Sequence, residues 1–428
     1  MTISTPSSYR LKKARRTMAV LGAAAMIGVF SALVADTLKV ITEHYEHDFV
    51  HRLKENKYLI FLLPLIGFTT IHILRHFLFR NKPNKGIKEV LDAITKDGKT
   101  LPAYKIPSHY FNGFLTVIFG GSTGIEVSTV VATASIGALS SHKVNHLNKY
   151  RTDLVCAGLA AGVTALFNAP IAGFMFAFEV FTKRRKKTHL ASLITAILTS
   201  YLLTKYFFYQ KVFTFDITGW HKEAFPYFIL LGVLAGFNSV FLTKSVLFFK
   251  KFFGSLGNDY VKILAGSLII STMVFFFPSL YGEGYAGIKN LTSIPHPENI
   301  YLLLPFVVVL LLKPIATSIT LGAGGDGGVF APSLFIGAFL GLITALTLNY
   351  FFQLDLIPLN FIVIGMAAVL SGSIHAPLTS IFLVCAIADN YILFVPIVIA
   401  SLISWFVAHF IFPYTVYTYK AKALLKVS

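Results

Sequence analysis

The glycine-rich stretch GAGGDGGVFAP, Gly322–Pro332, interrupts an otherwise apolar part of the chain. A second break of the same kind, GGSTGI at Gly120–Ile125, lies in the first half. A membrane interior has no water to bond loose backbone groups, so irregular backbone survives there only where protein buries it or where it lines a polar cavity. An apolar, helix-like run follows each break. The N–H groups at the start of each such helix would therefore lie inside the membrane, where they can bind an anion.

The composition indicates a membrane protein. Only 13% of the 428 residues are charged and 55% are hydrophobic, whereas soluble proteins carry about 25% charged residues. Several apolar runs are long enough to span the hydrocarbon core, and others are short enough to be half-spans. We expect an all-α polytopic fold with broken and tilted helices, on the runs Met18–Ala35, Tyr58–His72, Leu154–Phe178, Leu190–Leu203, Ile263–Leu280, Tyr301–Leu312 and Val329–Gln353.

The net charge of +18 is concentrated in short segments beside apolar runs, at Arg10–Arg16, Lys183–Lys187, Lys250–Lys251 and the final lysines from Lys420. The positive-inside rule then places both termini in the cytoplasm, in a cell (plasma or inner) membrane. No basic stripe on a soluble fold is present to bind nucleic acid. Cys156 and Cys385 lie in apolar helices and are interpreted as small hydrophobes.

An internal repeat organises the chain. AAGVTALFNAP at Ala160–Pro170 aligns with AAVLSGSIHAP at Ala367–Pro377, and the two glycine breaks lie at nearly the same separation. The charge pattern gives the two halves opposite topology, in which broken helices meet at the midplane and form a substrate site. Each Ala-Pro pair predicts a helix start, because proline is tolerated in a first turn.

The predicted organisation has five parts. They are a basic cytoplasmic N-terminus (1–16), a first inverted-repeat half (17–208), an external linker (209–224), a second half (225–413), and a pore-lining C-terminal helix with a tail (414–428). The stretch Tyr281–Asn299 carries little net charge and is also expected on the external side.

These motifs resemble those of the CLC chloride channels and proton-coupled chloride transporters, over nearly the whole membrane portion. Gly328–Pro332 (GVFAP) resembles the GxFxP segment of that family, and Phe167–Gly173 (FNAPIAG) resembles its FNAPLAG stretch. HAPLT at His375–Thr379 is the counterpart in the second half. Val416-Tyr417 resembles a helix end that carries an inward-pointing tyrosine.

The resemblance and the glycine breaks together predict an anion site. Backbone N–H groups of Gly124, Ile125, Val329 and Phe330 would supply partial positive charge, and Tyr417 would add a neutral hydroxyl donor. Partial charges suit a conducted anion, because full charges would hold it too tightly to release. No metal site, catalytic residue or cofactor is expected; the anion itself is the ligand.

Two positions depart from the family pattern for proton coupling. The family's gating glutamate aligns with Thr123, and its internal proton-handling glutamate aligns with Val180, next to Glu179. Threonine can neither compete with an anion as a carboxylate would nor carry a proton at ordinary pH. Glu126 lies one turn further on. It is interpreted either as a displaced gate or, by preference, as a first-turn acid that stabilises the helix dipole.

The inner mouth also departs from the pattern. The family's GSGIP segment aligns with Asn84–Lys88, so that Lys85 and Gly86 form the expected inner mouth. Lys85 either concentrates anions there or is one more positive-inside residue. Asp326 is expected to cap the helix that follows it, and Glu179 to pair with backbone N–H groups or the basic loop.

The resulting hypothesis is a passive chloride (monovalent anion) channel of CLC type in the lipid bilayer, one of the voltage-gated chloride channel family. The resemblance implies a homodimer with a pore in each subunit. The alternative is a proton-coupled secondary transporter that uses Glu126 as its gate. An enzyme is not indicated, because neither H-E-x-x-H nor a G-x-S-x-G motif with triad partners is present.

Overall fold

The computed structural model describes residues 6–82, 84–95, 100–143, 147–181, 186–208, 213, 215–292, 294 and 299–419. Within these ranges the regular structure is helical, apart from one isolated backbone bridge. Part of the basic loop after Phe181 and the lysine-bearing tail from residue 420 lie outside the described residues. So does most of the predicted C-terminal helix.

The described helices lie before and after the predicted linker at 209–224, and the division into two halves stays a prediction. Those of the first half are α1 Pro6–Glu55, α2 Leu63–Ile73, α3 Ile87–Thr95, α4 Lys105–Ile118, α5 Glu126–Lys143, α6 Arg151–Phe167, α7 Pro170–Phe176 and α8 Lys187–Phe207. Those of the second half are α9 Phe225–Ser255, α10 Asp259–Phe276, α11 Tyr285–Leu291, α12 Leu304–Gly322, α13 Phe330–Phe352, α14 Pro358–Ile374, α15 Pro377–Ile387 and α16 Phe394–Ile411.

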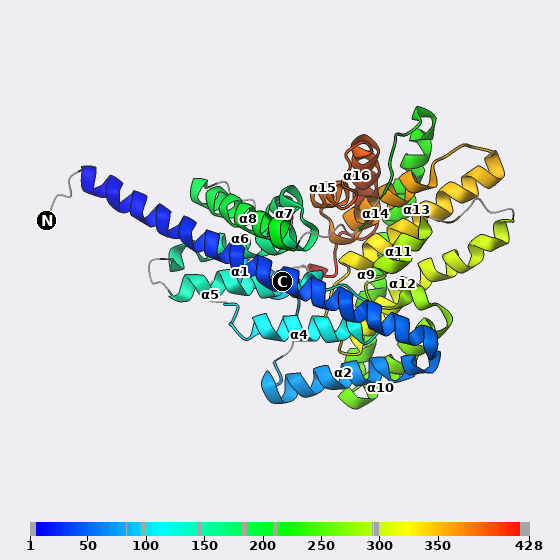
Figure 1. Ribbon diagram of the computed structural model, residues 1–428, viewed down its shortest axis with the longest axis horizontal. Coiled ribbons are helices and arrows are strands. Elements are labelled where there is room, and N and C mark those ends of the chain that lie inside the picture. The colour runs from blue at the N-terminus through cyan, green and yellow to red at the C-terminus, as the bar shows by residue number, and fades with distance from the viewer. Residues whose placement is uncertain are drawn as a thin grey trace.

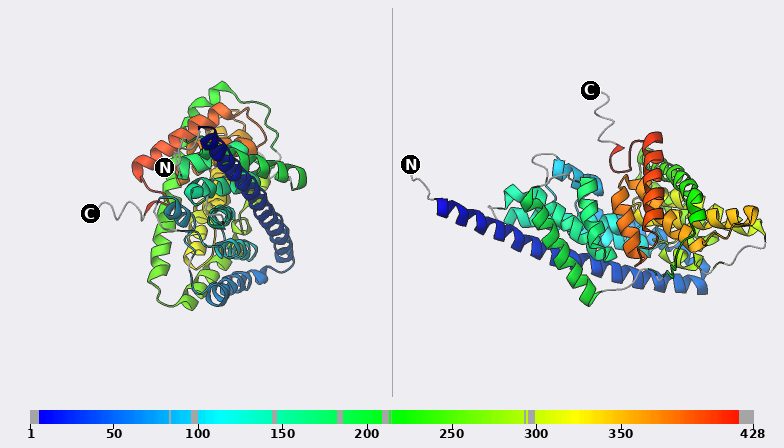
Figure 2. Two further views of the ribbon diagram at one scale, coloured as in Figure 1. Left: turned by 90° about the vertical axis from the view of Figure 1, so that its left-hand side faces the viewer. Right: turned by 90° about the horizontal axis from the view of Figure 1, so that it is seen from above.

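Within the described residues, eight helical segments are long and apolar enough to cross a membrane, and α7, α14 and α15 are shorter apolar helices. Figure 1 shows α5 to α8 gathered on one side and α13 to α16 on the other, with the long helix α1 running obliquely across the molecule. The side views in Figure 2 show α1 along one edge of the bundle. The predicted all-α membrane fold with broken helices is confirmed.

The Ala-Pro pairs begin helices at the same place in both halves. Asn168 (φ 50°) and His375 (φ 54°) end α6 and α14 in the left-handed conformation, and Pro170 and Pro377 open α7 and α15. A proline at the first helical position is suitable because its missing N–H would have no helical partner there. The backbone therefore has the same conformation at the equivalent positions of the sequence repeat.

The two glycine breaks contact each other. Gly328 N–H donates to Gly124 O at 3.1 Å, and Gly124 N–H lies 3.5 Å from Gly328 O. Gly120 and Gly324 both have positive φ, 86° and 114°, which glycine adopts at little cost. Equivalent positions in the breaks are 204 residues apart (328 − 124). The helices after them, α5 and α13, begin at the same separation (330 − 126).

A threonine from each half bonds the loop of the other half. The Thr116 hydroxyl accepts a bond from Asp326 N–H at 2.9 Å, and the Thr320 hydroxyl accepts one from Ser122 N–H at 3.0 Å. Both hydroxyls are buried and donate to the carbonyl four residues back in their own helices. These crossing bonds satisfy loop N–H groups for which burial without a partner would be costly.

Candidate anion site

Two helix N-termini lie side by side at the paired glycine breaks. Helix α5 begins at Glu126 and α13 at Phe330, directly beyond the Gly124–Gly328 bridge. The first N–H groups of a helix have no partner within it, and they carry the positive end of the helix dipole. The structure thus brings Gly124 and Ile125 together with Val329 and Phe330, and all four are buried.

Glu126 occupies the position in the first half that Phe330 occupies in the second. Its side chain is 2% exposed. Oε1 accepts a bond from the Tyr285 hydroxyl at 2.9 Å, whereas Oε2 has no hydrogen-bond partner. The carboxylate lies against Gly124, where even a methyl group would collide with it. A carboxylate therefore stands among the amides that the sequence predicts to bind an anion.

Tyr417, near the end of the described chain, reaches the same site. Its hydroxyl is buried and has no hydrogen-bond partner. It lies beside the backbone of Val329 and close enough to Glu126 to interact with its charge. A buried hydroxyl without a protein partner is uncommon, and this one lies at the start of α13. The role of Tyr417 as a donor to an anion stays a prediction.

Thr123, the predicted gate position, has a fully buried hydroxyl that donates to Gly328 O at 2.8 Å, so it fastens the two glycine breaks together. Helix α5 begins three residues later, at Glu126, which is the position equivalent to Phe330 in the second half. Both residues stay candidates for the gate.

Sequence reasoning missed an acidic residue at the site. Glu283, which is 3% exposed, accepts a bond from Ile125 N–H on Oε1 at 2.9 Å. Its loop is held by Lys313, whose ammonium group donates to Gly282 O at 3.1 Å. The signal in the sequence was a single acid between two glycines, in a stretch that otherwise resembles a weakly charged linker.

The predicted inner mouth is open to solvent at Lys85. This side chain is exposed, and its backbone N–H donates to Glu89 Oε1 at 2.5 Å. Gly86 adopts φ 61°, and a Cβ there would press on Val127 in α5. This loop therefore packs beneath the anion-binding helix, while the lysine itself points away from the buried site.

Asp326 does not cap α13 as the sequence predicts. The N-cap residue of α13 is Val329, and no side chain caps it. Asp326 instead accepts a hydrogen bond from Asn84 of the inner mouth and lies 3.5 Å from Arg75. The carboxylate thus ties the second glycine break to the inner loop, and its charge is compensated there.

A second ion pair stabilises the inner loop from α3. Lys105 lies 2.7 Å from Glu89, and His109 lies 3.5 Å from it. Burial alone would raise the pKa of Glu89, but the hydrogen bonds with His109 and Lys105 and the lysine charge outweigh it. They hold that pKa below its ordinary value. Glu89 is therefore ionised at neutral pH.

Glu179 and Val180 lie on the π-helical turn after α7. The Glu179 carboxylate accepts bonds from Leu378 N–H at 3.0 Å and Thr379 N–H at 2.9 Å, at the start of α15. The expected pairing with backbone N–H groups is thus present, and it joins the two halves. Val180 is partly buried among apolar neighbours and offers no group that can titrate.

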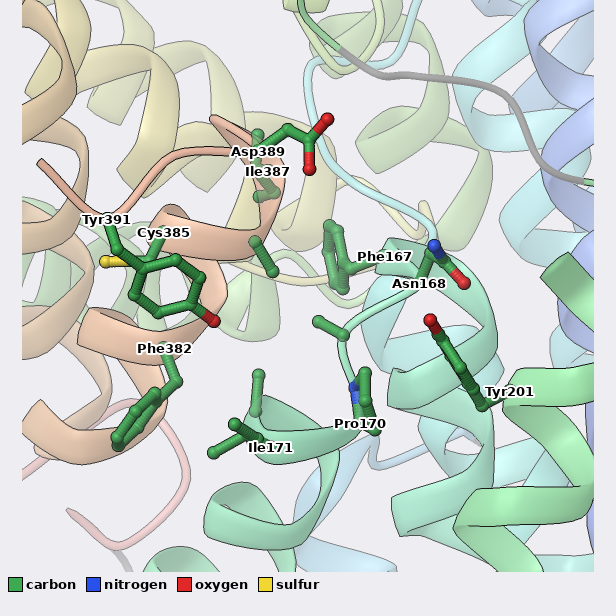
Figure 3. A pocket seen from close by; sticks show the side chains of 13 residues that line it. Phe167, Asn168, Pro170, Ile171, Tyr201, Phe382, Cys385, Ile387, Asp389 and Tyr391 are labelled. Carbon is green, nitrogen blue, oxygen red and sulfur yellow. The ribbon is translucent and has the colours of Figure 1, made fainter. Parts of the chain in front are cut away.

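A cavity of about 250 Å³ lies away from these residues, between the start of α7 and the end of α15. Figure 3 shows Asn168 and Tyr201 on one side of it and Cys385 and Tyr391 on the other. None of its lining residues belongs to the predicted anion site. Its wall is mixed, with Asn168, Tyr201, Asp389 and Tyr391 among apolar side chains.

Comparison with known proteins places the chain in a family. The family model described as voltage gated chloride channel matches residues 66–409. A ClcB-like chloride channel protein of Ralstonia nicotianae is 28% identical over 81% of this chain and 82% of its own length. The H(+)/Cl(-) exchange transporter ClcA of Vibrio cholerae is 30% identical over 69% of this chain and 65% of its own length.

Solved structures share the fold. A slow cyanobacterial Cl-/H+ antiporter has a TM-score of 0.82 at 20% identity, over 95% of this chain and 98% of that one. A CLC-type fluoride/proton antiporter has a TM-score of 0.77 at 23% identity, over 97% and 98%. The protein belongs to the CLC family, whose activity is the transport of anions across membranes.

Proposed function

We propose that the protein exchanges a monovalent anion such as chloride for protons, with Glu126 as both gate and proton carrier. The observation that carries this proposal is the Glu126 carboxylate, which lies against the backbone N–H groups of Glu126 itself at the start of α5 and of Ala331 at the start of α13. An ionised carboxylate is itself an anion and competes for those amides. A protonated carboxylate is neutral, binds them less tightly and leaves the site to a transported anion.

This alternation couples the two ions. The site holds either the side-chain carboxylate or a transported anion, so release of one accompanies binding of the other. Tyr417 stays a neutral donor beside the anion throughout. The named relatives that exchange H+ for Cl- support coupled transport better than the passive channel that Thr123 suggested.

A passive channel remains the second candidate, because one observation favours it. The inner position expected to carry a proton-handling acid is Val180, and valine cannot take up a proton. In an uncoupled protein Glu126 would open and close the anion path without delivering its proton to the other side.

Liposomes that contain the purified protein distinguish these functions. We expect an imposed proton gradient to drive chloride uptake against its own gradient in the unaltered protein. Glu126→Gln removes the titratable group but keeps its shape, so passive chloride flux should persist while proton-driven uptake is lost. Thr123→Ser, which keeps the hydroxyl bond to Gly328, is the matched control and should remain coupled.

The coupled mechanism is refuted if the unaltered protein dissipates a chloride gradient but never responds to a proton gradient. That result would establish the passive channel instead. A Glu126→Gln variant that still pumps chloride with protons would also refute it, because the carrier would then be another group.

We further propose a homodimer in a plasma or inner membrane, with both termini in the cytoplasm and no cofactor. The resemblance to the family and the basic N-terminal segment support this arrangement. Ile171 on α7 and Leu378 on α15 are 45% and 42% exposed in a single subunit, which is consistent with contact to lipid or to a second subunit. Cross-linking in the native membrane tests the oligomeric state.

A further inference from the structure

The loop before α11 brings a second carboxyl group to the start of α5, beside the proposed anion site. Ile125 N–H, one of the predicted anion-binding amides, donates to Glu283 Oε1 at 2.9 Å. Glu283 is 3% exposed, so this bond is made away from bulk water. When the carboxyl group is ionised, such a bond is about twice as strong as a neutral one. The amide therefore already has a partner when an anion arrives.

The groups around Glu283 make its charge conditional. It faces Glu43 and Glu46 of α1, Glu126 of α5 and Lys313 of α12, and Tyr285 donates to Glu126. Carboxylates gathered in one buried site resist simultaneous ionisation, because each disfavours the charge of the next. Lys313 interacts with Glu46, Glu126 and Glu283, so the fully ionised cluster carries more negative than positive charge, and uptake of a proton relieves this excess.

Lys313 is fixed in this cluster by the backbone. Its ammonium group is fully buried, bonds Gly282 O and Leu280 O, and lies 4.8 Å from the ring centre of Phe335. Gly282 adopts φ 55°, a conformation that favours glycine, and the Glu46 carboxylate lies where a Cβ would project. Lys313 thus holds this loop by its backbone, and Glu283 is the next residue along it.

We propose that Glu283 is a second tethered carboxylate, which holds the Ile125 amide and yields it to an anion that enters from outside. This inference rests on the proposed anion site and adds an outer competitor to the gate at Glu126. Removal of the competitor should strengthen anion binding. If the carboxylate holds the amide for about nine tenths of the time, the apparent dissociation constant falls about tenfold on its removal.

Calorimetric titration of the detergent-purified protein with chloride tests the competition. We expect the chloride dissociation constant to fall several-fold in Glu283→Ala, and by less in Glu283→Gln, whose neutral amide oxygen still accepts the Ile125 bond. Glu223→Gln is the control, because that glutamate is exposed on the linker and should leave binding unchanged. Unchanged or weaker chloride binding in both Glu283 variants would overturn the proposal.

Anomalous diffraction from bromide soaked into crystals gives a second measurement. A purely structural role of Glu283 would leave this measurement unchanged. The anomalous peak of bromide should appear within hydrogen-bond distance of Ile125 N in Glu283→Ala and be absent there in the unaltered protein. The absence of a new peak in Glu283→Ala refutes the proposed subsite. Because both measurements report binding at equilibrium, they are independent of whether the transport is coupled to protons.

Discussion

At the scale of single residues, the proposed site combines fixed donors to the anion with carboxylates that compete with the anion for those donors. Backbone amides are fixed in number and charge, whereas the Glu126 and Glu283 carboxylates can move or be neutralised. Tyr417 belongs with the fixed group, since its phenol stays protonated at neutral pH. The transported anion thus meets a constant set of donors and a variable set of competitors.

Tyr417→Phe should weaken anion binding without changing proton coupling. The buried hydroxyl has no protein partner, so its loss removes a donor to the anion and leaves no other group unsatisfied. A hydrogen bond to a charged group is worth about 1.5–3 kcal/mol, which corresponds to about a tenfold or larger rise in the dissociation constant. Calorimetric titration with chloride measures this dissociation constant, and Tyr414→Phe is the control. An unchanged dissociation constant in Tyr417→Phe would show that the anion binds elsewhere.

Glu89→Gln should destabilise the protein most at neutral pH. Glu89 lies on α3, outside the candidate spans, and its partners His109 and Lys105 hold its folded pKa below the ordinary value of 4.5. The stabilisation is therefore complete above that value and is lost as the pH falls through the lower folded pKa. Thermal unfolding in detergent should show a gap between variant and unaltered protein at pH 7 that narrows below pH 4.5. A gap independent of pH would contradict the ion pair.

At the scale of elements, a hydrogen bond to a threonine side chain joins each glycine break to a helix of the other half. Each loop N–H, from Ser122 and Asp326, is bonded by a hydroxyl from the helix before the opposite loop. The start of α5 is therefore positioned by α12, and the start of α13 by α4. Neither half completes its own anion-binding terminus.

Thr116→Val and Thr320→Val test this interlock. Valine keeps the shape but leaves a buried N–H without a partner, which costs about 1–3 kcal/mol. We expect each variant to unfold at lower temperature and to bind chloride less tightly, because the helix ends shift. Thr116→Ser retains the hydroxyl and should stay close to the unaltered protein. Equal loss in the serine and valine variants would show that packing, and not the bond, is responsible.

Element boundaries were predictable where the residue type dictates the backbone. Pro170 and Pro377 begin helices as expected, because proline suits only the first turn, and the glycine breaks end where helices start. The register of the first break was not predictable. Matching by glycines aligned the gate with Thr123, whereas the Gly124–Gly328 bridge makes Glu126 equivalent to Phe330, and only the fold reveals that bridge.

At the scale of the whole molecule, the sequence predicted the class and topology but not the long-range contacts. Composition and the repeat were sufficient for an inverted-repeat membrane fold. The approach of Glu283 to Ile125, 158 residues away, left no periodic or compositional trace, because a single acid in a linker is ordinary. The partner of Asp326 was missed for the same reason, since Asn84 comes from a distant loop.

The crossing threonine bonds relate the two halves as a two-fold axis relates two subunits. Each half gives the other the same bond that it receives, which is the reciprocity of an interface between identical chains. In a pair of identical chains, every substitution appears at both equivalent positions. Because the two halves here belong to one chain, the equivalent positions can differ, and they hold an acid at Glu126 and a phenylalanine at Phe330.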